Sequence, residues 1–165
     1  MVDSILSLGS DALSNQFKLV FPNGIPSGGN TDAISLRMDQ SFDIPQQTIY
    51  KYDIDFRGAK ITKTGKKEET DKTVTFNVRL DDQWVVYDDL NAWFKMTYDP
   101  VTNVALPDLL VRTTMEVHAL NSAGETSKVF KLRNAKMTDL KIGTFDNSTG
   151  DPIRLEITIT YGTLE

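Results

Sequence analysis

Strict alternation of apolar and polar side chains is the feature of this sequence that most constrains its fold. The clearest run is 73–80, where Val74, Phe76, Val78 and Leu80 alternate with polar residues. An extended strand points successive side chains to opposite faces, so a period of two predicts a strand buried on one face. Alternating or strand-like patterns predict further strands at 15–21, 34–39, 50–57, 111–118, 126–133, 136–145 and 153–161.

One segment has the period of a helix instead. In residues 86–98 the apolar positions recur every three or four residues, which places them on one helical face. Pro100 follows directly after this segment and would end a helix there. The apolar residues of the predicted face are Val86, Leu90, Trp93 and Phe94.

The number and spacing of these elements predict the fold class. Short, regularly spaced strands with one helix are typical of an antiparallel β-barrel or two-sheet sandwich with a packed α-helix. The chain has 165 residues without an internal repeat or a linker, so we expect a single domain over 1–165. Residues 1–14 are expected to form an N-terminal arm or a short helix.

A long hairpin is expected to project from this fold over residues 50–78. The alternating run 50–57 precedes a polar stretch at 58–72, which is predicted to be the tip, and 73–80 is predicted to be the return strand. A two-stranded hairpin is marginally stable alone, and its exposed edges invite pairing with another chain. We therefore expect the hairpin to dock on a partner by strand addition.

Charge is distributed unevenly along the chain. The net charge of −5, from 18 Lys and Arg against 23 Asp and Glu, argues against a generally basic nucleic-acid-binding surface. The segment 57–67 is basic and 81–99 is acidic, so these are either two solvated stretches or complementary surfaces that join copies head to tail. The predicted inter-subunit contacts are Arg57, Lys60, Lys63, Lys66 and Lys67 on one side and Asp81, Asp82, Asp88 and Asp89 on the other.

The residues needed for enzyme chemistry are scarce. The chain has no cysteine and a single histidine, His118, which excludes thiolate and multi-histidine metal sites. No Gly-x-Ser-x-Gly motif or nucleophile–base set accompanies His118, which is expected on the polar side of a strand. The sequence therefore predicts neither an enzyme nor a cofactor.

Asp53 and Asp55 are the strongest candidates for a cation site or a carboxylate pair, because they share one face of a predicted strand. Lys51 and Arg57 share that face as well, and a charged, solvated face explains the pattern more simply. The segments 58–67 and 146–151 lack the spacing of a phosphate loop and a calcium loop, respectively.

The N-terminal sequence carries no Lys or Arg before Lys18, so it lacks the basic start of a signal peptide. The longest apolar runs are only a few residues, far from the ~20 that span a bilayer. We therefore expect a protein that is made and assembled in a cytoplasm without a membrane anchor.

The order of several short segments resembles the tail tube proteins of contractile-tailed bacteriophages. These segments are Phe-Asp-Ile-Pro at 42–45, Asp-Phe-Arg-Gly-Ala-Lys-Ile at 55–61, Val-Thr-Phe-Asn-Val at 74–78, Trp93 in a helix, and Tyr161-Gly162. The resemblance implies a two-sheet β-barrel that forms hexameric rings, stacked into a hollow tube inside a contractile sheath. Tubes of type VI secretion and of contractile bacteriocins share this fold.

The resemblance also implies the partners. These are the protein itself, a sheath protein, baseplate and tail terminator proteins, and viral DNA that passes without specific binding, all within the virion. The hairpin at 50–78 would contact the neighbouring ring, and Asp53, Asp55, Thr75 and Arg79 are the residues expected to face the lumen. A baseplate initiator ring, the tube of a bacteriocin or type VI-like machine, and a monomeric ligand-binding β-barrel remain alternatives.

Overall fold

The computed structural model describes residues 17–39, 43–44, 47–68 and 72–165, and the predicted arm at 1–14 lies outside these ranges. Three helices and nine strands are assigned in this part of the chain. The helices are α2 (Thr31–Arg37), α3 (Val85–Thr97) and α4 (Asp108–Val111). The strands are β1 (Phe17–Val20), β2 (Met38–Asp39), β3 (Thr48–Phe56), β4 (Ala59–Glu68), β5 (Thr73–Arg79), β6 (Thr113–Leu120), β7 (Thr126–Ile142), β8 (Arg154–Thr160) and β9 (Thr163–Leu164).

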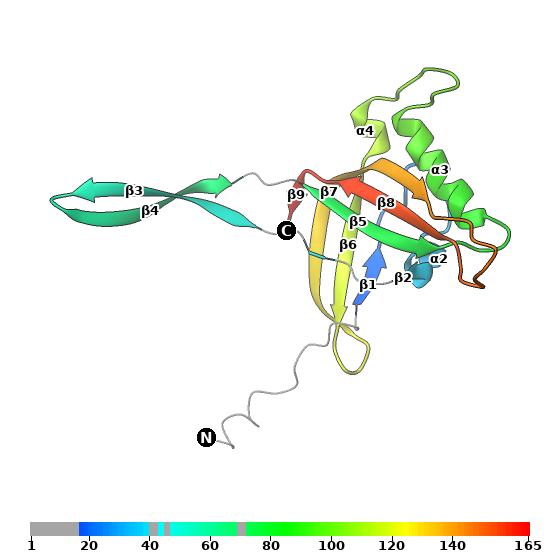
Figure 1. Ribbon diagram of the computed structural model, residues 1–165, viewed down its shortest axis with the longest axis horizontal. Coiled ribbons are helices and arrows are strands. Elements are labelled where there is room, and N and C mark those ends of the chain that lie inside the picture. The colour runs from blue at the N-terminus through cyan, green and yellow to red at the C-terminus, as the bar shows by residue number, and fades with distance from the viewer. Residues whose placement is uncertain (1–16, 40–42, 45–46, 69–71) are drawn as a thin grey trace.

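A seven-stranded antiparallel sheet forms the body, in the order β1-β6-β7-β8-β5-β2, with β9 added to β7 (Figure 1). The long strand β7 pairs with β6 through its first half and with β8 through its second half. Asn134 lies between the two halves with a φ of 56°, where the chain changes partner. The segments predicted as two strands at 126–133 and 136–145 are thus one strand that joins two layers.

The predicted barrel is not closed. In the part of the chain that the structure describes, no hydrogen-bonded pairing joins the outer strands β1 and β2. These edge strands have four and two residues, so they offer few groups for pairing with each other. The mainly β, antiparallel class is confirmed, whereas a closed β-barrel is not found among the described residues.

Of the strand predicted at 34–39, residues 34–37 belong to α2, and Met38–Asp39 form the short strand β2. The side chain of Asn30 accepts a hydrogen bond from the Ala33 N–H at 3.1 Å and caps α2. Ile34 is buried, but Leu36 is 80% exposed, so the alternation of Ile34 and Leu36 does not mark one buried face.

The core lies between the two layers of the sheet and α3. Trp93 on α3 is fully buried, packs edge-on against Phe21, and donates a hydrogen bond from Nε1 to the Val111 carbonyl at 2.8 Å. The other large, fully buried side chains are Leu19, Ile34, Val78, Leu90, Val111, Met115, Leu132, Met137, Leu155, Ile157 and Ile159. This packing holds α3 against β7 (Figure 1).

The acidic residues before α3 fix where the helix begins. Asp81 accepts hydrogen bonds from the Val85 and Val86 N–H groups at 3.1 and 3.2 Å, while Trp84 has a φ of 60°. Partial burial alone would raise the pKa of Asp81, but these backbone hydrogen bonds and the nearby Arg37 lower it. The helix starts and ends one residue earlier than the predicted 86–98.

The hairpin consists of β3 and β4, which form a separate two-stranded sheet that extends away from the body (Figure 1). Arg57 and Gly58 form the turn with φ of 50° and 78°, as in a type I′ turn. The predicted tip at 58–72 and return strand at 73–80 are therefore wrong. The polar stretch after Gly58 is the return strand, and the apolar pattern of β5 belongs to the main sheet, where β5 pairs with β8 and β2.

Candidate assembly surfaces

One face of the hairpin is apolar and exposed. The register pairs Ile54 with Ile61, Phe56 with Ala59 and Tyr52 with Lys63, so these side chains lie on one side of the two strands. Phe56 is 57% exposed, and Tyr50, Tyr52, Ile54 and Ile61 are exposed as well. Among the described residues, β3 and β4 pair with no other strand, so nothing in this part of the chain covers the face.

The opposite face of the hairpin carries Asp53 and Asp55, as predicted from their spacing. Asp53 accepts a hydrogen bond from Thr62 at 2.7 Å and forms an ion pair with Lys60 at 2.9 Å. The Thr62 hydroxyl and the Lys60 ammonium both lower the pKa of Asp53. Asp53 is therefore an ionised, internally paired carboxylate that supports the strand pairing.

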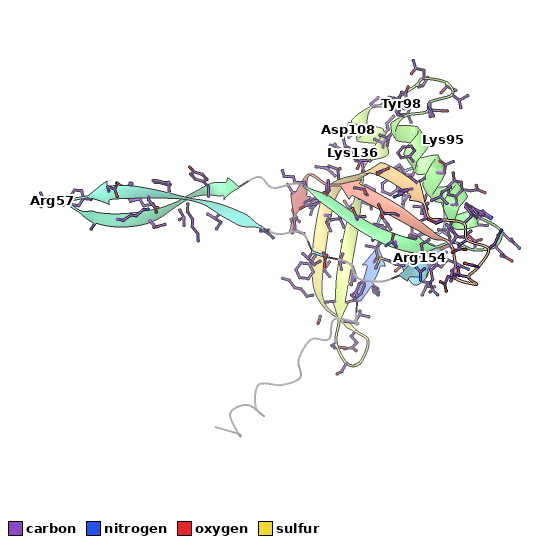
Figure 2. All side chains as sticks on the ribbon, viewed as in Figure 1. Arg57, Lys95, Tyr98, Asp108, Lys136 and Arg154 are labelled. Carbon is purple, nitrogen blue, oxygen red and sulfur yellow. The ribbon has the colours of Figure 1, made fainter. Side chains whose placement is uncertain are left out.

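The predicted basic contacts divide into three kinds. Arg57 lies at the far end of the hairpin and stacks over the Phe56 ring at 5.3 Å (Figure 2). Lys60 is paired with Asp53, whereas Lys63 lies on the apolar face opposite Tyr52. Lys66 and Lys67 are part of β4, but their side chains lie outside the described ones.

The predicted acidic contacts also divide. Asp81 caps α3, and Asp89 accepts a hydrogen bond from the Asn30 N–H at 3.3 Å. Asp82 and Asp88 are exposed. The structure places the start of α3 on the side of the body away from the hairpin, so basic and acidic segments do not meet within one chain (Figure 1).

Thr75 and Arg79 lie on the exposed face of β5, whereas Asp53 and Asp55 lie on the hairpin, so the four predicted lumen residues do not share one surface. The face around Thr75 is rich in threonine. Its hydroxyl is 3.2 Å from that of Thr158, and the hydroxyls of Thr138 and Thr160 are 3.1 Å apart.

His118 belongs to a partly buried polar cluster that the sequence pattern did not predict. Its Nε2 is 2.8 Å from a carboxylate oxygen of Glu116, its Nδ1 is 3.3 Å from the Thr126 hydroxyl, and Lys131 lies 3.4 Å from Glu116. The hydrogen bond from His118, followed by that from Lys131, lowers the pKa of Glu116 although partial burial opposes this. Glu116 and His118 share one face of β6 because they are two residues apart, whereas the pairing of β6 with β7 adds Lys131 and Thr126.

The sequence pattern did not predict two further exposed apolar surfaces. The first covers 98–110 around α4, where Val101 is 86% exposed and an ion pair between Lys136 and Asp108 at 2.6 Å joins α4 to β7. The second is a stack of Trp84 on Phe145 beside a cavity of about 490 Å³ in the turn 143–154. An apolar surface with such large exposed side chains is typical of a contact site.

The described residues contain no group of three or more His, Cys, Asp or Glu side chains arranged to hold a metal ion. Within the same ranges, no helix is long and apolar enough to cross a membrane.

Solved structures with the same fold come from contractile particles. The chain matches one chain of the anti-feeding prophage cap, described as a tube-terminating cap, with a TM-score of 0.65, 12% identity and coverage of 96% of this chain and 91% of that one. It matches a chain of the sheath–tube complex of an extracellular contractile injection system with a TM-score of 0.61, 14% identity and coverage of 98% and 95%. A chain from the sheath/tube terminator of that system matches with a TM-score of 0.56, 18% identity and coverage of 96% and 97%.

No protein-family model matches the sequence, and no curated protein matches it. At these low identities, the likeness to the solved structures establishes the fold. The chain shares its fold with chains of contractile injection particles over nearly its whole length.

Proposed function

We propose that this chain is a structural subunit of a phage tail tube, which assembles into stacked hexameric rings that conduct viral DNA inside a contractile sheath. The observation that carries the proposal is the hairpin, whose exposed apolar face has no cover among the described residues. Burying one such side chain stabilises an assembly by about 1.5–3 kcal/mol, so a second copy that covers this face gains substantially. The fold shared with chains of a tube-terminating cap and a sheath–tube complex supports this role.

In this proposal the partners are further copies of the chain, a sheath protein, and baseplate and tail terminator proteins. The particle is a virion assembled in the host cytoplasm. The exposed face of β5 and β8 with Thr75 and Arg79 lines the lumen, and the hydroxyls of Thr75 and Thr158, 3.2 Å apart, give this face an uncharged stretch that offers DNA phosphates no ionic contact. Asp53 and Asp55 on the hairpin are the second proposed lumen surface.

A terminal ring is the second candidate function. The fold shared with a chain of a tube-terminating cap, with a TM-score of 0.65, supports a subunit that starts or ends a tube. The tube of a bacteriocin or type VI-like machine remains a variant of the leading proposal. The two roles differ in self-assembly, since a repeating subunit forms long tubes alone whereas a terminal subunit stops at one ring.

The test is to purify the full chain and follow its assembly by light scattering and electron microscopy. We expect hollow rings or tubes at high concentration. The matched variant replaces Thr48–Glu68 with a short Gly-Ser linker, and we expect it to remain folded by circular dichroism but not to stack. A wild-type chain that stays monomeric at every concentration would overturn the proposal.

A further inference from the structure

The hairpin and the rest of the chain differ in charge. Residues 48–68 contain six basic and three acidic side chains, so the hairpin carries +3 while the rest of the chain carries −8. Figure 1 shows the hairpin tip at one end of the long axis, and the turn 80–84 and the turn 143–152 at the other. If copies are repeated by translation along this axis, the basic hairpin tip of one copy therefore meets the turns 80–84 and 143–152 of the next copy.

The two ends also match in their apolar side chains. At the hairpin end, Phe56 and Ile54 are exposed on the face that also carries Lys63. At the opposite end, Phe145 is 67% exposed and stacks on Trp84 with a ring-centroid distance of 6.2 Å, and Val85 is exposed beside them. We call the surface formed by Trp84, Val85, Phe145 and the adjoining cavity the receiving end.

The cavity of the receiving end suits a guanidinium in particular. It measures about 490 Å³, and its charged lining consists of two carboxylates, Asp146 and Asp151, and one cation, Arg154, beside the Phe145 ring. Arg57 is the outermost side chain of the hairpin and, among the described residues, has no carboxylate partner. A guanidinium binds carboxylates through paired hydrogen bonds and stacks on aromatic rings, so this site offers both of its preferred contacts.

We propose that the hairpin tip of one copy docks into the receiving end of the next copy, with Arg57 in the cavity and Phe56 against Phe145. The inference rests on the proposed function, which requires contact between copies, and adds where the hairpin binds. The apolar surface at 98–110 is the competing position. Its Asp108 is already neutralised by Lys136, whereas Asp146 at the receiving end is bonded to the uncharged N–H and hydroxyl of Ser148.

Disulfide crosslinking tests the contact directly, because the chain has no cysteine of its own. The test chain carries Ala59→Cys at the hairpin tip and Thr149→Cys at the cavity, and is oxidised after assembly. Matched chains combine Ala59→Cys with Leu109→Cys on the competing surface or with Ala123→Cys in the β6–β7 turn. We expect a ladder of covalent oligomers on a denaturing gel for the Thr149 chain and not for the two others.

A ladder formed through Leu109 would overturn the docking site in favour of the 98–110 surface. Rings or tubes without a Thr149 crosslink would overturn the docking site and leave the proposed function intact. A wild-type chain that stays monomeric would overturn both.

Charge reversal gives a second readout that does not depend on introduced cysteines. Arg57→Glu with Lys63→Glu makes both ends acidic, and Asp146→Lys with Asp151→Lys makes both ends basic. We expect the amount of stacked assemblies formed by each variant alone to fall by about tenfold or more, because like charges then face each other. An equimolar mixture should restore stacking, since each tip then meets an opposite charge; stacking that is unchanged in either variant alone would contradict the proposal.

Discussion

Trp93 is the side chain that connects α3, α4 and the sheet. It is fully buried, its ring packs edge-on against Phe21, and its Nε1 donates a hydrogen bond to the Val111 carbonyl at 2.8 Å. A buried carbonyl that loses its donor still carries the cost of desolvation. Removing the Trp93 donor therefore lowers the free energy of unfolding by more than the net contribution of one hydrogen bond.

Trp93→Phe retains an aromatic ring but removes this donor and part of the buried volume. We expect the free energy of unfolding to fall by about 1–3 kcal/mol, as measured by urea denaturation. Trp84→Phe is the matched control, because the contacts of the Trp84 ring are with two other rings, stacked on Phe145 and edge-on to Tyr87. An equal loss in both variants would contradict the role of the Val111 hydrogen bond.

The cluster around Glu116 predicts how stability depends on pH. Because its pKa is lower in the folded chain than its ordinary 4.5, Glu116 binds fewer protons in the folded state than in the unfolded state near that pH. The stabilisation is therefore complete above about pH 5 and is lost as the pH falls through the lowered pKa.

Glu116→Gln removes this titration. We expect the free energy of unfolding of the variant to be about 0.5–1.5 kcal/mol lower than that of the wild type near neutral pH. This difference in unfolding free energy should disappear in acid. Urea midpoints measured across the acid range test this, with Glu125→Gln in the exposed β6–β7 turn as the control. If the difference in unfolding free energy between variant and wild type stays constant down to strong acid, Glu116 stabilises the fold through packing alone.

At the scale of elements, the hairpin is an independent unit. Its strands pair with each other and, within the described residues, with no other strand. Changes in its turn should therefore alter the hairpin and not the body.

Gly58 and Gly124 provide a matched pair to test this independence. Both have φ near 80° (78° and 80°) and open space around the position of an added Cβ, but Gly124 lies in the β6–β7 turn of the main sheet. A left-handed conformation costs a residue with a side chain about 1–2 kcal/mol. We expect Gly124→Val to lower the unfolding free energy of the body by this amount, and Gly58→Val to leave it unchanged while increasing hydrogen exchange in β3 and β4.

At the scale of the whole molecule, the −5 net charge is less informative than its placement. With +3 on the hairpin and −8 elsewhere, contacts between copies should depend on ionic strength. Raising sodium chloride to about 1 M shortens the Debye length to about 3 Å, so we expect fewer stacked assemblies by sedimentation while the monomer stays folded. Stacking that strengthens steadily with salt would indicate contacts dominated by apolar burial.

The sequence by itself determined the mainly β class, the position of α3 and the amphipathic character of 50–57. Strand and helix geometry give apolar side chains on one face a period of about two and about 3.6 residues, respectively, and both periods can be read from the sequence. The tertiary structure decided which strands pair. The polar run 59–68 could be a loop or an exposed strand on its pattern alone, and 73–80 could pair with either sheet. Pairing of β6 with β7 also brought Lys131 to Glu116, and the tertiary structure placed Arg57 and the turn 143–152 at opposite ends. Local propensity carries no information about which segments meet in space.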